Sequence, residues 1–352
     1  MTARPLWGRD LAELLAPAGP RRQPMRGFEE SYADIIDYII RCTWRIWEGR
    51  GIDLIRTHYA EDCPVHTMTG TVLGIQPVIA GTRAVLAAFP DRTLVGEAVI
   101  WSGDDELGYL SSHRITSHAT HLGPNEYGQP TGRRIDFTTI ADCFCRENLI
   151  VEEWLVRDHA AIVRKLGLDV CALARSQAAA DQATGPAEWR QEAMQAIRDR
   201  SGAEARTDAV PDAGADPQAF ARAWFSAMLS GFAGEEAERF YAPFARAWLP
   251  DERSALGHEA IARRHLQFLD PFTDLAASCD HVGAVREGPY QDIAVRWLLT
   301  GRHAKDGLYG PATGRDAYIL AVTHLRVLDG RIVEQWTIFD ELALRRQLAG
   351  GL

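Results

Sequence analysis

Residues 131–166 read TGRRIDFTTIADCFCRENLIVEEWLVRDHAAIVRKL, and residues 313–348 read TGRDAYILAVTHLRVLDGRIVEQWTIFDELALRRQL. At a constant offset of 182 residues, the two stretches are identical at 11 of 36 positions. The shared residues are an opening Thr-Gly-Arg, the series Ile-Val-Glu-x-Trp-x-x-x-Asp and a closing Leu. Similarity at one long, fixed offset indicates a duplicated domain rather than a solenoid of short repeats.

The duplication extends over most of two units. Tyr59-Ala60 recurs as Tyr241-Ala242, and the segments 113–121 and 295–303 both keep an arginine and a closing histidine. Between the units lies a stretch rich in Ala, Asp, Gly and Gln with few large apolar residues, which is typical of a linker. We therefore expect an irregular N-terminal arm at 1–27, a first domain at 28–171, a linker with a short helix at 172–215, and a second domain at 216–352.

Hydrophobic periodicity predicts the order of the elements. Residues 28–49 carry apolar side chains at three- and four-residue steps, which indicates an amphipathic helix, and 75–88 predicts another. From Arg92 the period changes to two. This predicts antiparallel strands at 92–101, 107–121, 133–146 and 149–157. Helices followed by a run of strands favour an α+β class, with the helices on one face of a curved antiparallel sheet.

Composition and charge exclude several classes of protein. The net charge of −10 argues against non-specific nucleic-acid binding, which needs basic patches. The sequence contains no run of about 18 apolar residues, so no membrane span is expected, and the N-terminus lacks the apolar core of a signal peptide. Five of the six cysteines fall in the first unit and one in the second, so a repeated disulfide framework is excluded. Reduced thiols favour a cytoplasmic location.

The order of these motifs resembles that of the SnoaL-like polyketide cyclases, within the nuclear transport factor 2 and ketosteroid isomerase superfamily. The resemblance covers about 30–168 and 217–349, with the Trp-x-x-x-Asp ending as its most specific part. It implies two tandem cone-shaped α+β barrels, a small-molecule ligand and no cofactor. Members often dimerise through the open sheet face, so an internal pseudo-dimer of the two domains and a homodimer are further expectations. The superfamily also contains non-enzymes, so the fold alone does not decide function.

Asp158 and Asp340 end the repeated motif. The family uses the matching aspartate to remove an activated α-proton before an intramolecular aldol closure, so the resemblance makes Asp158 the general base of the first unit and Asp340 that of the second. A carboxylate beside an indole in an apolar cone would have a raised pKa, which suits this role. Alternatively, each aspartate caps the helix that follows it. The two interpretations are compatible.

Strand alternation supplies the other candidates. It predicts that Ile150, Glu152, Trp154 and Val156 share one face of their strand. The expected catalytic residues are Asp158, Asp142, His121, Asp340, His324 and His303, and the expected substrate-binding residues are Trp154, His113, Tyr59, Trp44, Trp336, Tyr318 and Arg296. The first unit has more polar candidates and is the preferred site.

Other arrangements are disfavoured. His113 and His121 lie eight residues apart, about 26 Å along an extended strand, which is too far for one metal ion. Cys143 and Cys145 are expected in the core. Two functional hypotheses remain. One is a cofactor-independent lyase, isomerase or cyclase that acts on a small carbonyl compound by enolate chemistry. The other is a duplicated scaffold that binds a ligand or dimerises without chemistry.

Overall fold

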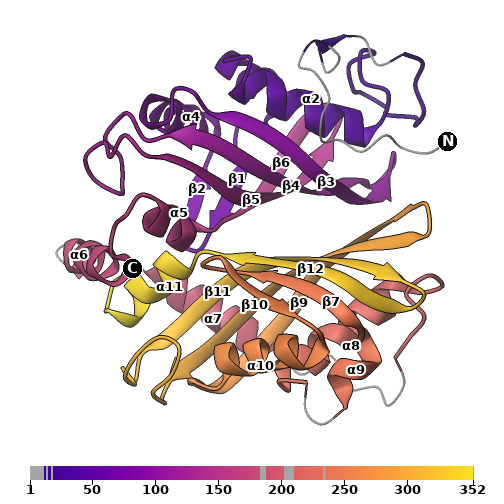
Figure 1. Ribbon diagram of the computed structural model, residues 1–352. Helices are drawn as coiled ribbons and strands as arrows, with labels where there is room; N and C mark the ends of the chain where they lie inside the picture. Colours follow the sequence, from indigo (N-terminus) through magenta and orange to yellow (C-terminus); the bar gives the residue numbers. More distant parts are fainter. Residues whose placement is uncertain are drawn as a thin grey trace. The chain divides into compact units, whose positions relative to one another are not determined.

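The computed structural model describes residues 12, 15, 16, 19–182, 188–201, 210–232 and 235–351. The chain divides into two compact units, each with its own sheet and helices (Figure 1). The first unit runs to Arg157 and includes 162–168, and the second comprises 158–161 and the chain from Asp169 onward. The short helix α5 (His159–Lys165) therefore contributes residues to both units.

The first unit contains a six-stranded sheet with the order β2-β1-β6-β5-β4-β3. Neighbouring strands are antiparallel, except that β1 runs parallel to β6. The sheet is curved and open rather than closed into a barrel. It is a mixed sheet because β1 runs parallel to β6 while the other pairs are antiparallel. The α+β class is confirmed. The strands are β1 (Pro64–Thr67), β2 (Gly70–Leu73), β3 (Thr93–Asp104), β4 (Gly108–Thr120), β5 (Arg134–Arg146) and β6 (Leu149–Arg157).

Helices cover one face of this sheet (Figure 1). Helix α2 (Ile35–Trp47) begins where the side chain of Asp34 accepts the backbone N–H of Asp37, and its apolar face packs on β3 and β4. This cap satisfies an N–H that the helix itself leaves unpaired. Helix α4 (Ile75–Ala88) has the predicted bounds and follows Gly74, whose φ of +85° favours glycine. Between them lie the 3-10 turn η1 (Ile52–Leu54) and α3 (Ile55–His58).

The second unit repeats this arrangement, with the sheet order β8-β7-β12-β11-β10-β9. The segment predicted as a linker contains α6 (Val170–Gln182) and α7 (Glu188–Arg200), while 183–187 and 202–209 lie outside the described residues. The remaining elements of the second unit are α8 (Pro217–Leu229), α9 (Glu236–Phe240), β7 (Tyr241–Leu249), β8 (Arg253–Leu256), α10 (His258–Leu269), β9 (Phe272–Glu287), β10 (Tyr290–His303), β11 (Asp316–Leu328), β12 (Arg331–Phe339) and α11 (Glu341–Leu348).

Strand β6 contains a β-bulge. Cys145 of β5 pairs with Ile150, but the preceding Phe144 pairs with Glu152, so Val151 has no partner in β5. An extra residue reverses the alternation of side chains beyond it. Ile150 therefore belongs to the helix-covered core, whereas Glu152 faces the other way. The expectation that one face carries both of these side chains is wrong.

Strand β12 has the same irregularity. Val327 of β11 pairs with Ile332 and Arg326 pairs with Glu334, which leaves Val333 unpaired. Beyond the bulge, Leu325 pairs with Gln335, as Cys143 pairs with Glu153 in the first unit. The repeated bulge places residue 153 in one unit, and residue 335 in the other, on the helix-covered face.

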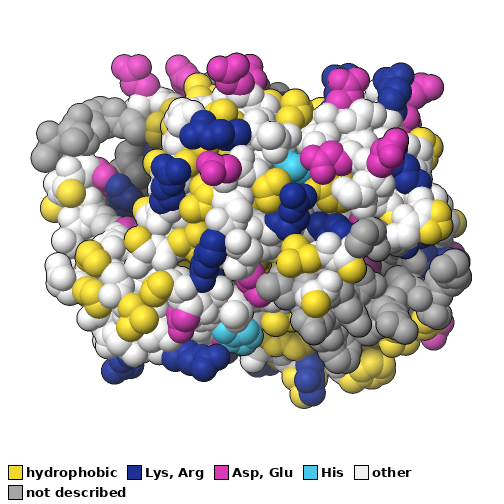
Figure 2. Space-filling model, turned by 90° about the horizontal axis from the view of Figure 1, so that it is seen from above, with side chains coloured by type: hydrophobic (Ala, Val, Ile, Leu, Met, Phe, Trp, Pro, Cys, Tyr) yellow, Lys and Arg dark blue, Asp and Glu magenta, His cyan; other side chains and the backbone are white. Residues whose placement is uncertain are grey.

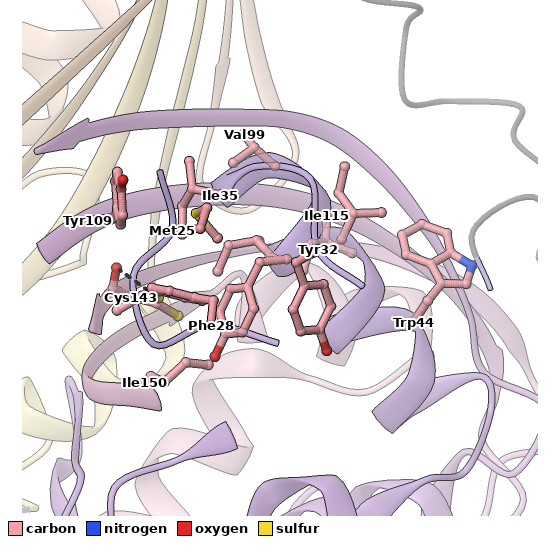
Figure 3. Packing of buried hydrophobic residues seen from close by; sticks show 14 of the residues in the cluster. Met25, Phe28, Tyr32, Ile35, Trp44, Val99, Tyr109, Ile115, Cys143 and Ile150 are labelled. Carbon is pink, nitrogen blue, oxygen red and sulfur yellow. Dashed lines mark hydrogen bonds between the residues drawn. The ribbon is translucent and has the colours of Figure 1, made fainter. Parts of the chain in front are cut away.

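The segment before α2 is part of the first core. Met25, Phe28 and Tyr32 are buried there against Tyr109 and Ile150 (Figure 3). The guanidinium of Arg21 donates to the backbone carbonyls of Pro24, Met25 and Phe28, which fixes this irregular stretch. The end of the expected N-terminal arm thus closes the core, while residues 1–11, 13, 14, 17 and 18 of that arm lie outside the described part.

The surface has no concentrated basic region on the face in Figure 2. Basic side chains there are scattered among acidic and hydrophobic ones. Among the described helices, none is both long and apolar enough to cross a membrane.

The burial of the cysteines yields a testable prediction. All six are free thiols, and only Cys171 is exposed. Burial raises the pKa of the Cys42 and Cys63 thiols to about 12, so they stay protonated and unreactive. A thiol reagent such as Ellman's reagent should label one cysteine per native chain rapidly and all six after denaturation. Cys171→Ala should remove the rapid phase. Two or more fast-reacting thiols would contradict the described packing.

Candidate active site

A buried acid lies on the inward face of β6. Glu153 is 7% exposed, and the hydroxyl of Tyr59 donates a hydrogen bond to its Oε2 at 3.1 Å. Burial raises the pKa of the Glu153 carboxyl to about 7, although the Tyr59 hydrogen bond and the charge of Arg157 both oppose the rise. A carboxyl group that titrates near neutral pH can both accept and return a proton under ordinary conditions.

The second unit has an amide at the equivalent position. The hydroxyl of Tyr241, which matches Tyr59, donates to Oε1 of Gln335 at 2.5 Å and accepts from Nε1 of Trp224 at 2.8 Å. The Gln335 amide nitrogen donates to Oγ1 of Thr337 at 2.8 Å. The two units therefore share a tyrosine that holds an inward side chain, but only the first holds a carboxyl group there.

The second unit also contains a small cavity of about 30 Å³. This volume admits water but is far below the roughly 300–1,000 Å³ of ordinary small-molecule pockets. Burial lowers the pKa of His265 in its wall to about 4, so that imidazole is neutral. The walls contain no acidic residue and comprise Met228, Leu249, Pro250, Arg253, Arg264, His265, Gln267, Phe268, Trp297, Leu308, Tyr309, Thr337 and Phe339.

Asp158 and Asp340 have the geometry of helix caps. Oδ1 of Asp158 accepts the backbone N–H of Ala161 at 3.0 Å, and its Oδ2 accepts that of Asp251 at 2.8 Å. Asp340 accepts the backbone N–H of Ala343 at 2.9 Å. Burial raises the pKa of Asp158 to about 7. Both oxygens of Asp158 thus accept backbone N–H groups. This fits the helix-capping role that the sequence offers as an alternative to catalysis.

His121 and His303 hold the loops that precede the Thr-Gly-Arg motifs. Nδ1 of His121 accepts the backbone N–H of Thr131 at 3.3 Å, and Nδ1 of His303 accepts that of Thr313 at the same distance. The two contacts join the end of a long strand to the start of the next. This anchoring gives a structural reason for the repeat of both the histidine and the Thr-Gly-Arg opening.

Six of the expected site residues lie on the sheet faces opposite the inward side chains, which are Glu153 in the first unit and Gln335 in the second. Asp142 and Trp154 are register partners there, as are His324 and Trp336, because they alternate with inward residues. Trp336 stacks on Trp248 with ring centroids 4.9 Å apart. Arg296 adjoins Trp297, whose ring packs against Phe225 of α8 on the inward side, and Tyr318 packs its ring edge against Trp189 of α7. The bulge in β6 explains why alternation grouped Trp154 with the inward Ile150.

Three expected residues do face the covered side, namely Tyr59, His113 and Trp44. His113 pairs in register with Ala141, which packs against the core. Glu153 itself was missed. The only signal for it in the sequence is the change from Glu153 to Gln335 between residues that both repeats keep.

The histidines do not form a metal site with each other. Nδ1 of His121 is engaged by Thr131, and its Nε2 lies 3.2 Å from Oδ1 of Asn125. Across the described part of the chain, no three His, Cys, Asp or Glu side chains come close enough together to hold a metal ion.

A profile of the SnoaL-like polyketide cyclase family matches residues 38–166 and again 218–348. The chain belongs to this family. It is the family that the motif order suggested, and the two matches confirm the tandem domains.

Similar solved structures span single units. TsrD from Streptomyces laurentii is 24% identical over 39% of this chain and 96% of its own, with a TM-score of 0.33. IdmH from Streptomyces antibioticus is 28% identical over 35% and 91%, with a TM-score of 0.29. A SnoaL-like polyketide cyclase from Agrobacterium tumefaciens is 18% identical over 37% and 96%, with a TM-score of 0.32. No curated protein matches the chain.

The raised pKa of Glu153 predicts how stability depends on pH. Its pKa is about 7 in the folded protein against an ordinary 4.5, so between these values the folded state holds the proton more tightly. Stability should therefore fall as pH rises through this window, by on the order of 3 kcal/mol for this group. Glu153→Gln should reduce the dependence of the free energy of unfolding on pH in this window and stabilise the protein at about pH 8.

Urea unfolding at several pH values measures this effect. Glu152→Gln is the matched control, because Glu152 is adjacent, faces the other way and pairs with His66 near the surface. An unchanged slope in Glu153→Gln, or an equal change in Glu152→Gln, would contradict the assignment.

Proposed function

We propose that the first unit is the catalytic unit of a cofactor-independent cyclase, isomerase or lyase for a small carbonyl compound, and that Glu153 is its general acid and base. The observation that carries this proposal is the buried Glu153 carboxyl, hydrogen-bonded by Tyr59 and titrating near neutral pH. Perturbed carboxyl groups of this kind concentrate at catalytic sites. Membership of the SnoaL-like family supplies the reaction class.

The proposed chemistry needs one proton carrier. The Glu153 carboxylate takes a proton from the carbon beside a carbonyl group, and the electron pair of the C–H bond moves into that carbonyl to form an enolate. In a cyclisation, the enolate carbon attacks a second carbonyl of the same molecule. The resulting alkoxide takes the proton back from the Glu153 carboxylic acid. No electron is gained or lost overall, so the scheme calls for no redox cofactor. Tyr59 positions the carboxyl group through its hydrogen bond.

Geometry favours Glu153 over the base suggested by the family motif. The oxygens of Asp158 accept two backbone N–H groups, so proton transfer there would compete with the cap. Glu153 instead accepts its hydrogen bond from a side chain, the Tyr59 hydroxyl, on the inward face. We therefore assign Asp158 a structural role in this scheme.

The second unit fits the alternative hypothesis of a non-catalytic copy. Gln335 does not titrate, and its amide is engaged by Tyr241, Thr337 and His265. Its cavity walls contain no acid. We propose that this unit supports or binds without acid–base chemistry.

The proposal predicts the activities of three variants. Proton–deuterium exchange at the α-carbon of small 1,3-diketones and β-keto esters, followed by NMR in heavy water, reports the first step without knowledge of the natural substrate. Glu153→Gln should slow enzyme-catalysed exchange by roughly 10²–10⁴-fold, since this is the usual contribution of a general base. Asp158→Asn and the control Glu152→Gln should retain exchange if folded. In the wild type, kcat/KM should rise with pH and level off above about 7.

Each contrary result has a distinct meaning. Loss of exchange in Asp158→Asn with full activity in Glu153→Gln would move the acid–base role to Asp158. If the wild type catalyses exchange in none of the 1,3-diketones and β-keto esters, the scaffold hypothesis would be favoured.

A further inference from the structure

The imidazole of His113 has an unpartnered nitrogen inside the first unit. The residue is 1% exposed, and within the described part of the chain its Nε2 has no hydrogen-bond partner. Its Nδ1 lies 3.5 Å from Oγ1 of Thr43 on α2. Burial lowers the pKa of His113 to about 3, so the ring is neutral near physiological pH. A buried polar group without a partner costs about 1–3 kcal/mol and calls for a functional explanation.

Gly96 lies directly beside this nitrogen. A Cβ at Gly96 would lie 3.1 Å from Nε2 of His113 and 3.3 Å from the ring of Trp44. Gly96 does not have a positive φ, so its backbone conformation does not require glycine. In Figure 3, Trp44 lies at the edge of the cluster, away from Phe28. A side chain at residue 96 would therefore crowd both Nε2 of His113 and the Trp44 ring, and glycine avoids this.

His113 and Glu153 face the same side of the sheet. Cys143 of β5 pairs with Glu153 of β6, and two residues along the same strand Ala141 pairs with His113 of β4. Strand spacings place the two Cα atoms about 12 Å apart. Side chains of this length, both directed inward with the small Ala141 between their rows, can reach opposite ends of one small molecule.

The second unit has neither residue at the matching positions. Val295 stands where the first unit has His113. By strand register Cys279 stands at the position of Gly96, because Gly96 pairs with Ile115 and Cys279 pairs with the equivalent Trp297. The unit with the inward carboxyl group is thus also the unit with His113 and Gly96.

We infer that His113 donates a hydrogen bond from Nε2 to the carbonyl oxygen of the substrate, next to Gly96 and Trp44. This assignment rests on the proposed function and adds its electrophilic partner. In this assignment the Thr43 hydroxyl donates to Nδ1, so the neutral ring carries its proton on Nε2. A fixed N–H that points to the oxygen on which negative charge develops, in a desolvated site, stabilises an enolate more than its parent ketone. A neutral imidazole can serve as such a donor.

Binding of an enolate mimic tests the donor directly. The probe is 4-nitrophenolate, an aromatic oxyanion, titrated into the full chain by calorimetry and by its visible absorbance. His113→Phe keeps the ring but removes the N–H and should weaken binding at least about tenfold. His113→Gln restores a donor and should recover part of the affinity. Gly96→Ala should weaken binding by crowding Nε2 of His113. His118→Asn, on the opposite face of the same strand, should change affinity less than twofold, within the usual scatter for a remote substitution.

Stability separates a binding role from a structural one. Because His113→Phe removes an unpaired buried N–H, it should unfold at the same urea concentration as the wild type or a higher one. Weaker probe binding accompanied by a clear loss of stability would overturn the inference. So would equal binding by wild type and His113→Phe, or no measurable binding by the wild type.

Glu153→Gln keeps this test distinct from the test of the proposed function. It should bind 4-nitrophenolate at least as tightly as the wild type, because a nearby negative charge is removed, even when it no longer catalyses exchange. If Glu153→Gln exchanges protons normally while His113→Phe fails to bind the probe, the donor stands and the acid–base assignment falls.

Discussion

One unpaired residue in the last strand of each sheet determines which side chains face the helices. Val151 interrupts the pairing of β6 with β5, and Val333 interrupts that of β12 with β11. Because the alternation reverses at the bulge, the side chain next to the repeated tryptophan, rather than the tryptophan itself, points inward. In the first unit that side chain is Glu153, where removal from water raises the carboxyl pKa to the value that acid–base chemistry at neutral pH requires.

The sequence predicted the fold well because the fold depends on patterns that a sequence displays. The duplication, the helix at 75–88 and the strand at 149–157 follow from period, turn residues and repetition. The sequence predicted the site poorly because no residue type indicates a bulge at Val151. Both faces of β6 also carry buried side chains, so polar and apolar positions do not alternate there. His113 lies on β4, whose own alternation is unbroken, and faces the covered side, whereas Trp154 lies beyond the bulge of β6 and faces the other way.

The two units illustrate how a duplicated fold can keep one structural frame and change its interior. Both retain the tyrosine beside the bulged strand, the capping aspartate and the histidine that anchors the Thr-Gly-Arg loop. The second unit pairs its inward Gln335 through side-chain hydrogen bonds. The first buries a carboxyl group, and within the described part of the chain Nε2 of its His113 has no hydrogen-bond partner; both features oppose stability. A protein retains such costly groups where they contribute to function.

The central claim is that the Glu153 carboxyl exchanges a proton near neutral pH inside the first unit. Infrared difference spectroscopy measures this without a substrate, because a protonated carboxyl group has a carbonyl band that the carboxylate lacks. Spectra of the wild type minus Glu153→Gln, taken from about pH 5 to about pH 9, should show that band and its loss with a midpoint near 7. A difference spectrum without the band at about pH 5.5, where an ordinary glutamate is already ionised, would contradict the account.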